Sequence, residues 1–307
     1  MAGSSAMLKT IDTYLNVRRA AGFKLKSAQY YLSSYARFAL SDTHVRADTA
    51  IRWAEQGRSE SSRAVRLQEL VRFARFAHSE DERHEVPSSD AFRRRRHRRL
   101  PYLFSAAEIE RIVEQAQCLG PRDSFRPRTY CTLFGLLSAT GMRISEALSL
   151  RLRDITPDGL IIRETKFRKS RLVCLHASVV DAIDQYLALR VLVAGADDHL
   201  FISHRGKHPL HYPIAGETFR TVLKAAGISP SPGRPQPRLH DLRHTFAVNA
   251  LQACSVARDH ADQHMLALST YLGHAHVADT YWYLDSTPQL MSDIAGACDA
   301  YLQGDTP

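Results

Sequence analysis

The chain has 307 residues, of which 44% are hydrophobic and 24% are charged, and this balance excludes an intrinsically disordered protein. Its formal net charge of +9 indicates a polyanionic partner, nucleic acid before a membrane surface. No apolar run reaches the roughly 20 residues that a membrane-spanning helix needs, and no signal pattern opens the chain, so we expect a cytoplasmic protein.

The N-terminal part predicts several short helices between residues 7 and 85, because breaks occur at Gly22, at residues 41–43 and at Gly57 and no alternating pattern suggests strands. The last of these helices carries an apolar stripe at helical spacing, formed by Leu67, Leu70, Val71, Ala74 and Ala77. Its arginines at positions 66, 72 and 75 lie off the stripe. A solvated helix face explains them best, and phosphate contact is the alternative.

A run of arginines marks a change in composition between residues 93 and 99, with Pro87 before it and Pro101 after it. Such a run cannot bury itself, so it predicts an exposed linker that follows a DNA backbone between two folded parts. We therefore expect a helical domain at residues 1–90, a linker at 91–101 and a second domain at 102–307.

The second domain is predicted to be mainly α with a small β-sheet. Ser105 and Glu108 match a capping box that begins a helix ending near Gln117. Further helices are expected at 128–139 and 143–150, and strands at 160–165 and 171–175 enclose a tight basic turn. The remainder is expected to be helical.

Two arginines stand out in this domain. Arg143 follows a glycine turn, and Glu146, one helical turn on, is placed to steady its guanidinium. A surface ion pair is the simpler interpretation of that pair. Arg243 shares a helix face with His240, which precedes it by three residues.

Metal binding is not indicated by the histidines and cysteines. His240 with His244, and His260 with His264, have i,i+4 spacing, but neither pair has the adjacent glutamate of a zinc helix, and spacing places no third ligand. The five cysteines are odd in number and form no CxxC pair, so we expect ordinary buried thiols. No cofactor is expected.

Near the C-terminus, Leu272-Gly273-His274 precedes a Tyr-Trp-Tyr cluster, and Tyr283 stands nine residues after His274. Aromatic residues of this kind are usually core residues. However, the ordered set Gly-Met-Arg-x-x-Glu, a turn lysine, His-x-x-Arg, Leu-Gly-His and a downstream tyrosine resembles the tyrosine recombinase (phage integrase) family over roughly residues 103–285.

The resemblance implies a two-domain clamp, with a helical core-binding (DNA-binding) domain at residues 1–90 and a catalytic domain at 102–307, and a role for each matching residue. Arg143 and Arg243 are expected to bind the scissile phosphate, His240 to accept the phenol proton, Lys166 to act as general acid, His274 to bind the phosphate and Tyr283 to be the nucleophile. Lys169 competes with Lys166, and Tyr281 competes with Tyr283. The stretch from Gln252 to His264 is longer than expected and suggests an extra interface loop.

The expected function is site-specific cleavage and rejoining of double-stranded DNA through a covalent 3′-phosphotyrosine intermediate, for integration or transposition of a mobile element. The resemblance implies a homotetramer on two duplexes, with partner recombinases as an open alternative and an association with the nucleoid. A type IB-like topoisomerase and a non-catalytic DNA-binding accessory protein are the rival functions. Apolar residues at helical spacing between positions 290 and 302 predict a C-terminal helix that packs on its own domain or docks on a neighbour.

Overall fold

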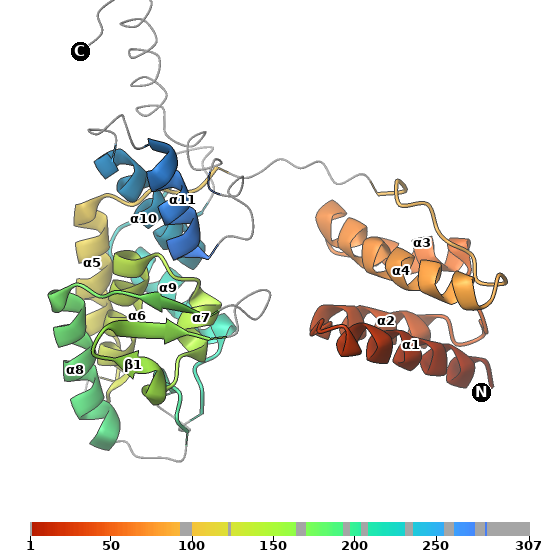
Figure 1. The fold of residues 1–307 in the computed structure, drawn as a ribbon, viewed down its shortest axis with the longest axis horizontal. Helices are drawn as coiled ribbons and strands as arrows, with labels where there is room; N and C mark the ends of the chain where they lie inside the picture. The colour runs from red at the N-terminus through yellow and green to blue at the C-terminus, as the bar shows by residue number, and fades with distance from the viewer. Residues whose placement is uncertain are drawn as a thin grey trace, which may run out of the picture. The chain divides into compact units, whose positions relative to one another are not determined.

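A computed structural model gives the fold of the chain, which divides into two compact units, residues 1–98 and 99–307 (Figure 1). The structure describes residues 2–92, 100–121, 124–163, 170–192, 197–203, 208–230, 236–254, 261–273 and 280. Among these residues, none of the helices combines the length and the apolar character that crossing a membrane requires.

Among its described residues, the N-terminal unit has four helices around one apolar core. They are α1 (Ala2–Ala20), α2 (Lys26–Phe38), α3 (Ala47–Glu55) and α4 (Glu60–Glu80). The first and the last of them are longer than the short helices that the sequence predicted. Helix α4 contacts each of the other three. Its whole predicted stripe is buried, with side chains no more than 4% exposed, and Trp53 packs edge-on against Tyr35 at 5.5 Å in the same core.

The arginines of α4 do not all lie on a solvated face of the helix. Arg72 is exposed and pairs with Glu69 of its own helix, as that interpretation predicts. Arg66, in contrast, is only partly exposed and places its guanidinium 4.4 Å from the centre of the Trp53 ring. This cation–π contact ties the side chain to the core.

The second unit begins with α5 (Ala106–Gln117), whose capping box of Ser105 and Glu108 is present as predicted. Helix α6 (Arg126–Thr140) contacts α5, α8 (Ala177–Leu192) and α10 (Leu239–Cys254). These contacts explain why the apolar residues of α6 lie on most of its sides. The other helices in the described part of this unit are α7 (Ile144–Ser149), α9 (Tyr212–Ala225) and α11 (Ala261–Leu272), and a short 3-10 helix spans Leu152–Asp154.

A three-stranded antiparallel sheet lies in the second unit, in the order β1-β2-β3. The strands are β1 (Ile155–Thr156), β2 (Gly159–Ile162) and β3 (Arg171–Val173). Ile162 is opposite Arg171, so β2 and β3 are paired strands that residues 163–170 separate in sequence. The mainly α fold with a small sheet is confirmed, although the described strands end earlier than the sequence predicted.

The cysteine prediction is partly wrong. Cys118 and Cys174 are exposed, and Cys131 is half-buried and packs against the core of the second unit. The other two cysteines lie where side chains are not described.

Candidate active site

Two arginines that are a hundred positions apart in sequence meet at the end of α11. Arg143 stands directly before α7, and Arg243 lies in the first turns of α10. The carbonyl oxygen of Leu272 accepts a hydrogen bond from each guanidinium, at 3.4 Å from Arg143 Nη1 and 2.8 Å from Arg243 Nη2. A single main-chain oxygen therefore fixes the two cations beside each other.

The turn at Gly141 brings α6 and α10 into this arrangement. Gly141 ends α6 with φ +60°, and its carbonyl accepts a hydrogen bond of 2.8 Å from Arg243 Nη1. A Cβ at this position would lie 2.4 Å from Cδ1 of Phe246, a ring of α10 that stacks on Tyr271 of α11. Only glycine satisfies both the backbone angle and the close contact.

A second glycine closes the site from the side of α11. Gly273 has φ +67°, and its carbonyl accepts a 3.0 Å hydrogen bond from Arg143 Nη2. A Cβ there would lie 2.8 Å from Nη1 of Arg171. The next residue in the chain is His274, so these contacts fix the point from which its segment departs.

Glu146 holds Arg143 from the other side. Its carboxylate accepts hydrogen bonds from the main-chain nitrogen of Arg143 at 2.9 Å and from Nη1 at 2.8 Å. The pair is not the surface ion pair that the sequence allowed, because the Glu146 side chain is 9% exposed. Desolvation alone raises the pKa of Glu146, but hydrogen bonds and charge from Arg171 and Arg143 outweigh it and lower the pKa to about 2.

Arg171 is a member of this cluster that the sequence analysis did not single out. It forms a bidentate pair with Glu146, Nη1 to Oε1 at 3.1 Å and Nη2 to Oε2 at 2.7 Å. The available signal was its position as the first residue after the basic turn. Its partner depends on how β3 lies against α7, which spacing alone does not reveal.

His240 lies near both arginines at the start of α10. Part of the residue is exposed to solvent, while its ring meets the ring of His244 edge-on at 4.6 Å. Desolvation by the surrounding protein, followed by the positive charges of Arg243, Arg238 and Arg143, lowers the pKa of His240 to about 4. The ring is therefore neutral at pH 7 and able to accept a proton.

The start of α10 is fixed by Asp241. This residue is 1% exposed, and its carboxylate accepts a 2.7 Å hydrogen bond from the main-chain nitrogen of Arg238. Such a bond satisfies a donor at the helix N-terminus and favours the negative charge there. It sets the orientation of the turn that carries His240 and Arg243.

Of the six site residues expected from the sequence, the structure brings three together, namely Arg143, His240 and Arg243. Lys166, His274 and Tyr283 lie outside the described residues, as do the competing Lys169 and Tyr281. The described chain stops close to each of them. In sequence, Lys166 lies between the end of β2 at Ile162 and the start of β3 at Arg171, and Gly273 directly precedes His274.

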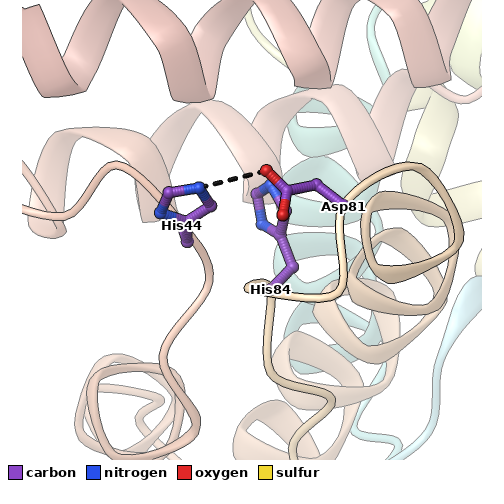
Figure 2. A group of neighbouring side chains, drawn as sticks. All are labelled: His44, Asp81 and His84. Atoms are coloured by element: carbon purple, nitrogen blue, oxygen red, sulfur yellow. Dashed lines mark hydrogen bonds and ion pairs between the residues drawn. The ribbon is translucent and has the colours of Figure 1, made fainter.

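Within the described residues, two groups have potential ligand atoms close enough together to hold a metal ion, and neither group belongs to the arginine cluster. One is His44, Asp81 and His84 of the N-terminal unit, drawn in Figure 2, and the other is Asp197, Asp198 and His199. Nδ1 of His84 accepts a 3.0 Å hydrogen bond from the main-chain nitrogen of Val45. This bond places the proton of the neutral ring on Nε2, which then has no lone pair for a metal.

The other partners in these groups are also engaged with protein atoms. His44 pairs with Asp81, and the Asp81 carboxylate also accepts hydrogen bonds from the main-chain nitrogen, Nε and Nη2 of Arg83. In the second group, Arg151 Nη1 donates to both carboxylate oxygens of Asp198, at 2.6 and 2.9 Å. The first group thus joins the segment before α3 to the segment after α4. In both groups the potential metal ligands are used in hydrogen bonds within the protein, which favours a structural role over metal binding.

Comparison with known proteins gives concordant results. Residues 103–289 match the model of the phage integrase family. The chain is 38% identical over 301 residues to the Sinorhizobium fredii protein y4rB, an integrase/recombinase by name, with 94% of this chain and 96% of that protein covered. It is 30% identical over 244 residues to the tyrosine recombinase XerD of Halalkalibacterium halodurans, covering 78% and 76% of the two chains.

A solved structure shows the same fold over almost the whole length. The Tn1549 transposon integrase, in complex with transposon right end DNA, superposes with a TM-score of 0.63 at 18% identity. The match covers 93% of this chain and 99% of that chain.

Proposed function

Because this chain belongs to the tyrosine recombinase (phage integrase) family, we propose that it is a site-specific DNA recombinase that cleaves and rejoins DNA through a 3′-phosphotyrosine intermediate. The observation that carries the proposal is the pair of guanidinium groups held side by side on the Leu272 carbonyl. Two planar, permanently charged forks are suited to the negative charge that develops on the non-bridging oxygens of a phosphodiester under attack.

The cleavage step exchanges one phosphoester bond for another. The phenol oxygen of Tyr283 attacks phosphorus, the bond from phosphorus to the 5′ oxygen breaks, and the leaving oxygen takes a proton from Lys166. His240 accepts the proton of the phenol, and His274 hydrogen-bonds the phosphate. Attack by the 5′-hydroxyl of another strand reverses the exchange, so rejoining needs no ATP. The roles of Lys166, His274 and Tyr283 rest on their positions in the family motifs.

The neutrality of His240 supports its assignment as the proton acceptor. An imidazolium has no lone pair for a proton, whereas the lowered pKa of His240 keeps the ring in its neutral form at pH 7. A bound phosphate partly neutralises the nearby guanidinium charges and so raises the pKa of His240, which strengthens the ring as a base when DNA is present.

At the scale of the assembly, we propose that four protomers act on two DNA duplexes to integrate or transpose a mobile element. Residues 1–90 are assigned to DNA binding, 91–101 to a linker along the backbone and 102–307 to catalysis. Support comes from the net charge of +9 and from the fold shared with a transposon integrase. Association with the nucleoid is part of the same proposal. Isolation of the assembled complex on DNA tests for partner recombinases and for the docking of the C-terminal segment.

The central test is covalent capture of DNA. A nicked duplex is built on the sequence that the wild-type chain selects from a random library, and the complex that resists SDS is counted on a gel. Tyr283→Phe is expected to abolish this complex, because the phenol oxygen is the attacking atom. Tyr281→Phe is the matched control and retains it. A covalent complex formed by Tyr283→Phe contradicts the assignment of the nucleophile.

The same assay separates the rival functions. Wild-type chain that forms no covalent complex on its selected site supports a DNA-binding accessory protein. Relaxation of any supercoiled plasmid by the wild-type chain, without a site and without strand exchange, supports a type IB-like topoisomerase. Exchange of strands between two duplexes that carry the site supports the recombinase.

A further inference from the structure

The carboxylate of Glu146 is shared between two arginines, and only one of them is a proposed phosphate ligand. Arg143 holds it through one guanidinium nitrogen and the main chain, whereas Arg171 holds it with two parallel hydrogen bonds of 3.1 and 2.7 Å. The side chains of Glu146 and Arg171 are 9% and 13% exposed. A bidentate pair of this kind, largely withdrawn from water, fixes the plane of the carboxylate.

The charges of the cluster explain why a second arginine matters. Arg143 and Arg243 contribute +2 and Glu146 contributes −1, so these three groups alone carry +1. Arg171 adds +1 and restores the sum to +2. Glu146 is thereby able to orient Arg143 without halving the positive charge that the phosphate meets.

Arg171 also lies where three motif segments come together. It is the first residue of β3, the strand that follows the Lys166 segment in sequence, and its backbone pairs with Ile162. Its guanidinium lies against Gly273, because a Cβ added to that glycine would come within 2.8 Å of Nη1. The side chain thus contacts both the segment that precedes His274 and the carboxylate that holds Arg143.

We propose that Arg171 is a positioning residue for DNA cleavage: it fixes Glu146 so that Arg143 meets the scissile phosphate in a set orientation and with its charge uncancelled. This proposal rests on the recombinase function proposed above. Arg171 acts through Glu146 and Arg143, and no contact of its own with DNA is required.

The chain offers a matched control at the other end of the Lys166 segment. Arg163 follows β2 and pairs with the buried carboxylate of Asp154, whose other oxygen accepts a hydrogen bond of 3.0 Å from the main-chain nitrogen of Arg151. This pair resembles Arg171–Glu146 in chemistry and anchors the opposite strand. No contact that links it to Arg143 is present among the described residues.

The test compares Arg171→Gln with Arg163→Gln in single-turnover cleavage of two nicked duplexes. One has the natural phosphate at the cleaved position, and the other has a methylphosphonate, which is neutral because a methyl group replaces one non-bridging oxygen. Thermal unfolding and DNA affinity are measured for each variant, and rates are taken well below the unfolding temperature.

We expect Arg171→Gln to slow cleavage of the phosphate substrate by about tenfold or more, as misplacement of a charge-stabilising group does. Its effect on the methylphosphonate should be much smaller, since less charge develops there, and its DNA affinity should stay close to wild type. Arg163→Gln should change the two rates by the same small factor. Arg171→Lys, which keeps the charge but loses the bidentate fork, should fall between Arg171→Gln and wild type.

Three results overturn the proposal. They are a wild-type rate for Arg171→Gln on the phosphate substrate, an equal loss on both substrates, and a loss on the phosphate no larger than that of Arg163→Gln. If Arg171→Gln does not fold, Arg171→Lys carries the same comparison, and an equal loss on both substrates counts against the proposal. Failure of the wild-type chain to cleave either duplex instead contradicts the recombinase function itself.

Discussion

Desolvation lowers the pKa of His240 most, and the positive charges of three arginines lower it further; two of these arginines are assigned to the phosphate. The third, Arg238, stands two residues earlier and pairs with Asp241 at 3.8 Å. Its charge acts on His240 in the same direction as those of Arg243 and Arg143, lowering the pKa. This offers a way to change the ring's protonation without altering the proposed site residues.

We predict that Arg238→Gln raises the pKa of His240 from about 4 toward the usual histidine value, because a repelling positive charge is removed. The imidazolium then persists to higher pH, so the acid limb of the cleavage rate shifts to higher pH. NMR titration of the His240 ring, assigned with His240→Gln, measures the pKa directly. Arg220→Gln on α9 is the control and should leave both the pKa of His240 and the pH dependence of cleavage unchanged. A titration curve that Arg238→Gln does not shift contradicts the electrostatic account.

At this scale the sequence predicted more of the chemistry than of the packing. Arg143, Arg243 and His240 lie together, as the motifs indicate, because each motif fixes a local turn or helix start that points the side chain. The pairing of Arg171 with Glu146 depends on the register of β3 and on packing between segments far apart in sequence. The choice between Tyr281 and Tyr283 stays a prediction.

Among the elements, the C-terminus of α6 illustrates how a helix end builds a binding site. The helix stops at Gly141 in a left-handed conformation, and the freed carbonyl accepts the hydrogen bond of Arg243. The adjoining Phe246 ring fills the space where a side chain would begin. Stability and site geometry therefore depend on the same residue.

We predict that Gly141→Ala destabilises the chain by about 1–3 kcal/mol, because alanine at a left-handed position is strained and its Cβ collides with Phe246. The matched control is Gly135→Ala in the same helix, where nothing lies within 4 Å of the added Cβ. This change should be neutral or stabilise by about 0.5–1 kcal/mol. Urea unfolding of the two variants checks the pair, and an equal free energy of unfolding for both is inconsistent with the strained turn.

Helix limits were predicted well where a cap or a glycine marks them. Ser105 with Glu108 begins α5, and Gly141 ends α6, since these residues satisfy end groups of the helix in any context. The sheet was predicted less well. Strand β1 has two residues, too few to show an alternating pattern, and β2 ends among the described residues at Ile162. Short strands depend on neighbours that the local sequence does not specify.

For the molecule as a whole, charge is the property most directly tied to the proposed partner. Six arginines occur between positions 93 and 99 in a chain with a net charge of +9. Composition predicted a boundary in this region, and the two compact units meet in sequence at residues 98 and 99. Which phosphates the two units and the run bind stays a prediction, because the run itself lies outside the described residues.

We predict that replacing the six arginines of the run with serine weakens DNA binding and makes it less dependent on salt. For every phosphate that the run no longer neutralises, the slope of log affinity against log salt concentration should fall by about 0.9, because fewer counterions are released. Fluorescence anisotropy between about 50 and 200 mM salt measures the slope. A variant with six lysines should keep it, and a serine variant with the wild-type slope places the run away from the DNA backbone.

The shared carbonyl of Leu272 has a consequence for how the site tolerates change over evolutionary time. Both arginines bind a main-chain oxygen that every amino acid possesses, and the neighbouring bonds go to the carbonyls of Gly141 and Gly273. Replacement of the side chain at position 272 leaves this oxygen in place, whereas insertion or deletion of a residue in the last turn of α11 or at Gly273 changes which carbonyls face the arginines. Here the length of the chain is therefore more constrained than the identity of its side chains. Among functional descendants, insertions and deletions in this segment should be rarer than substitutions.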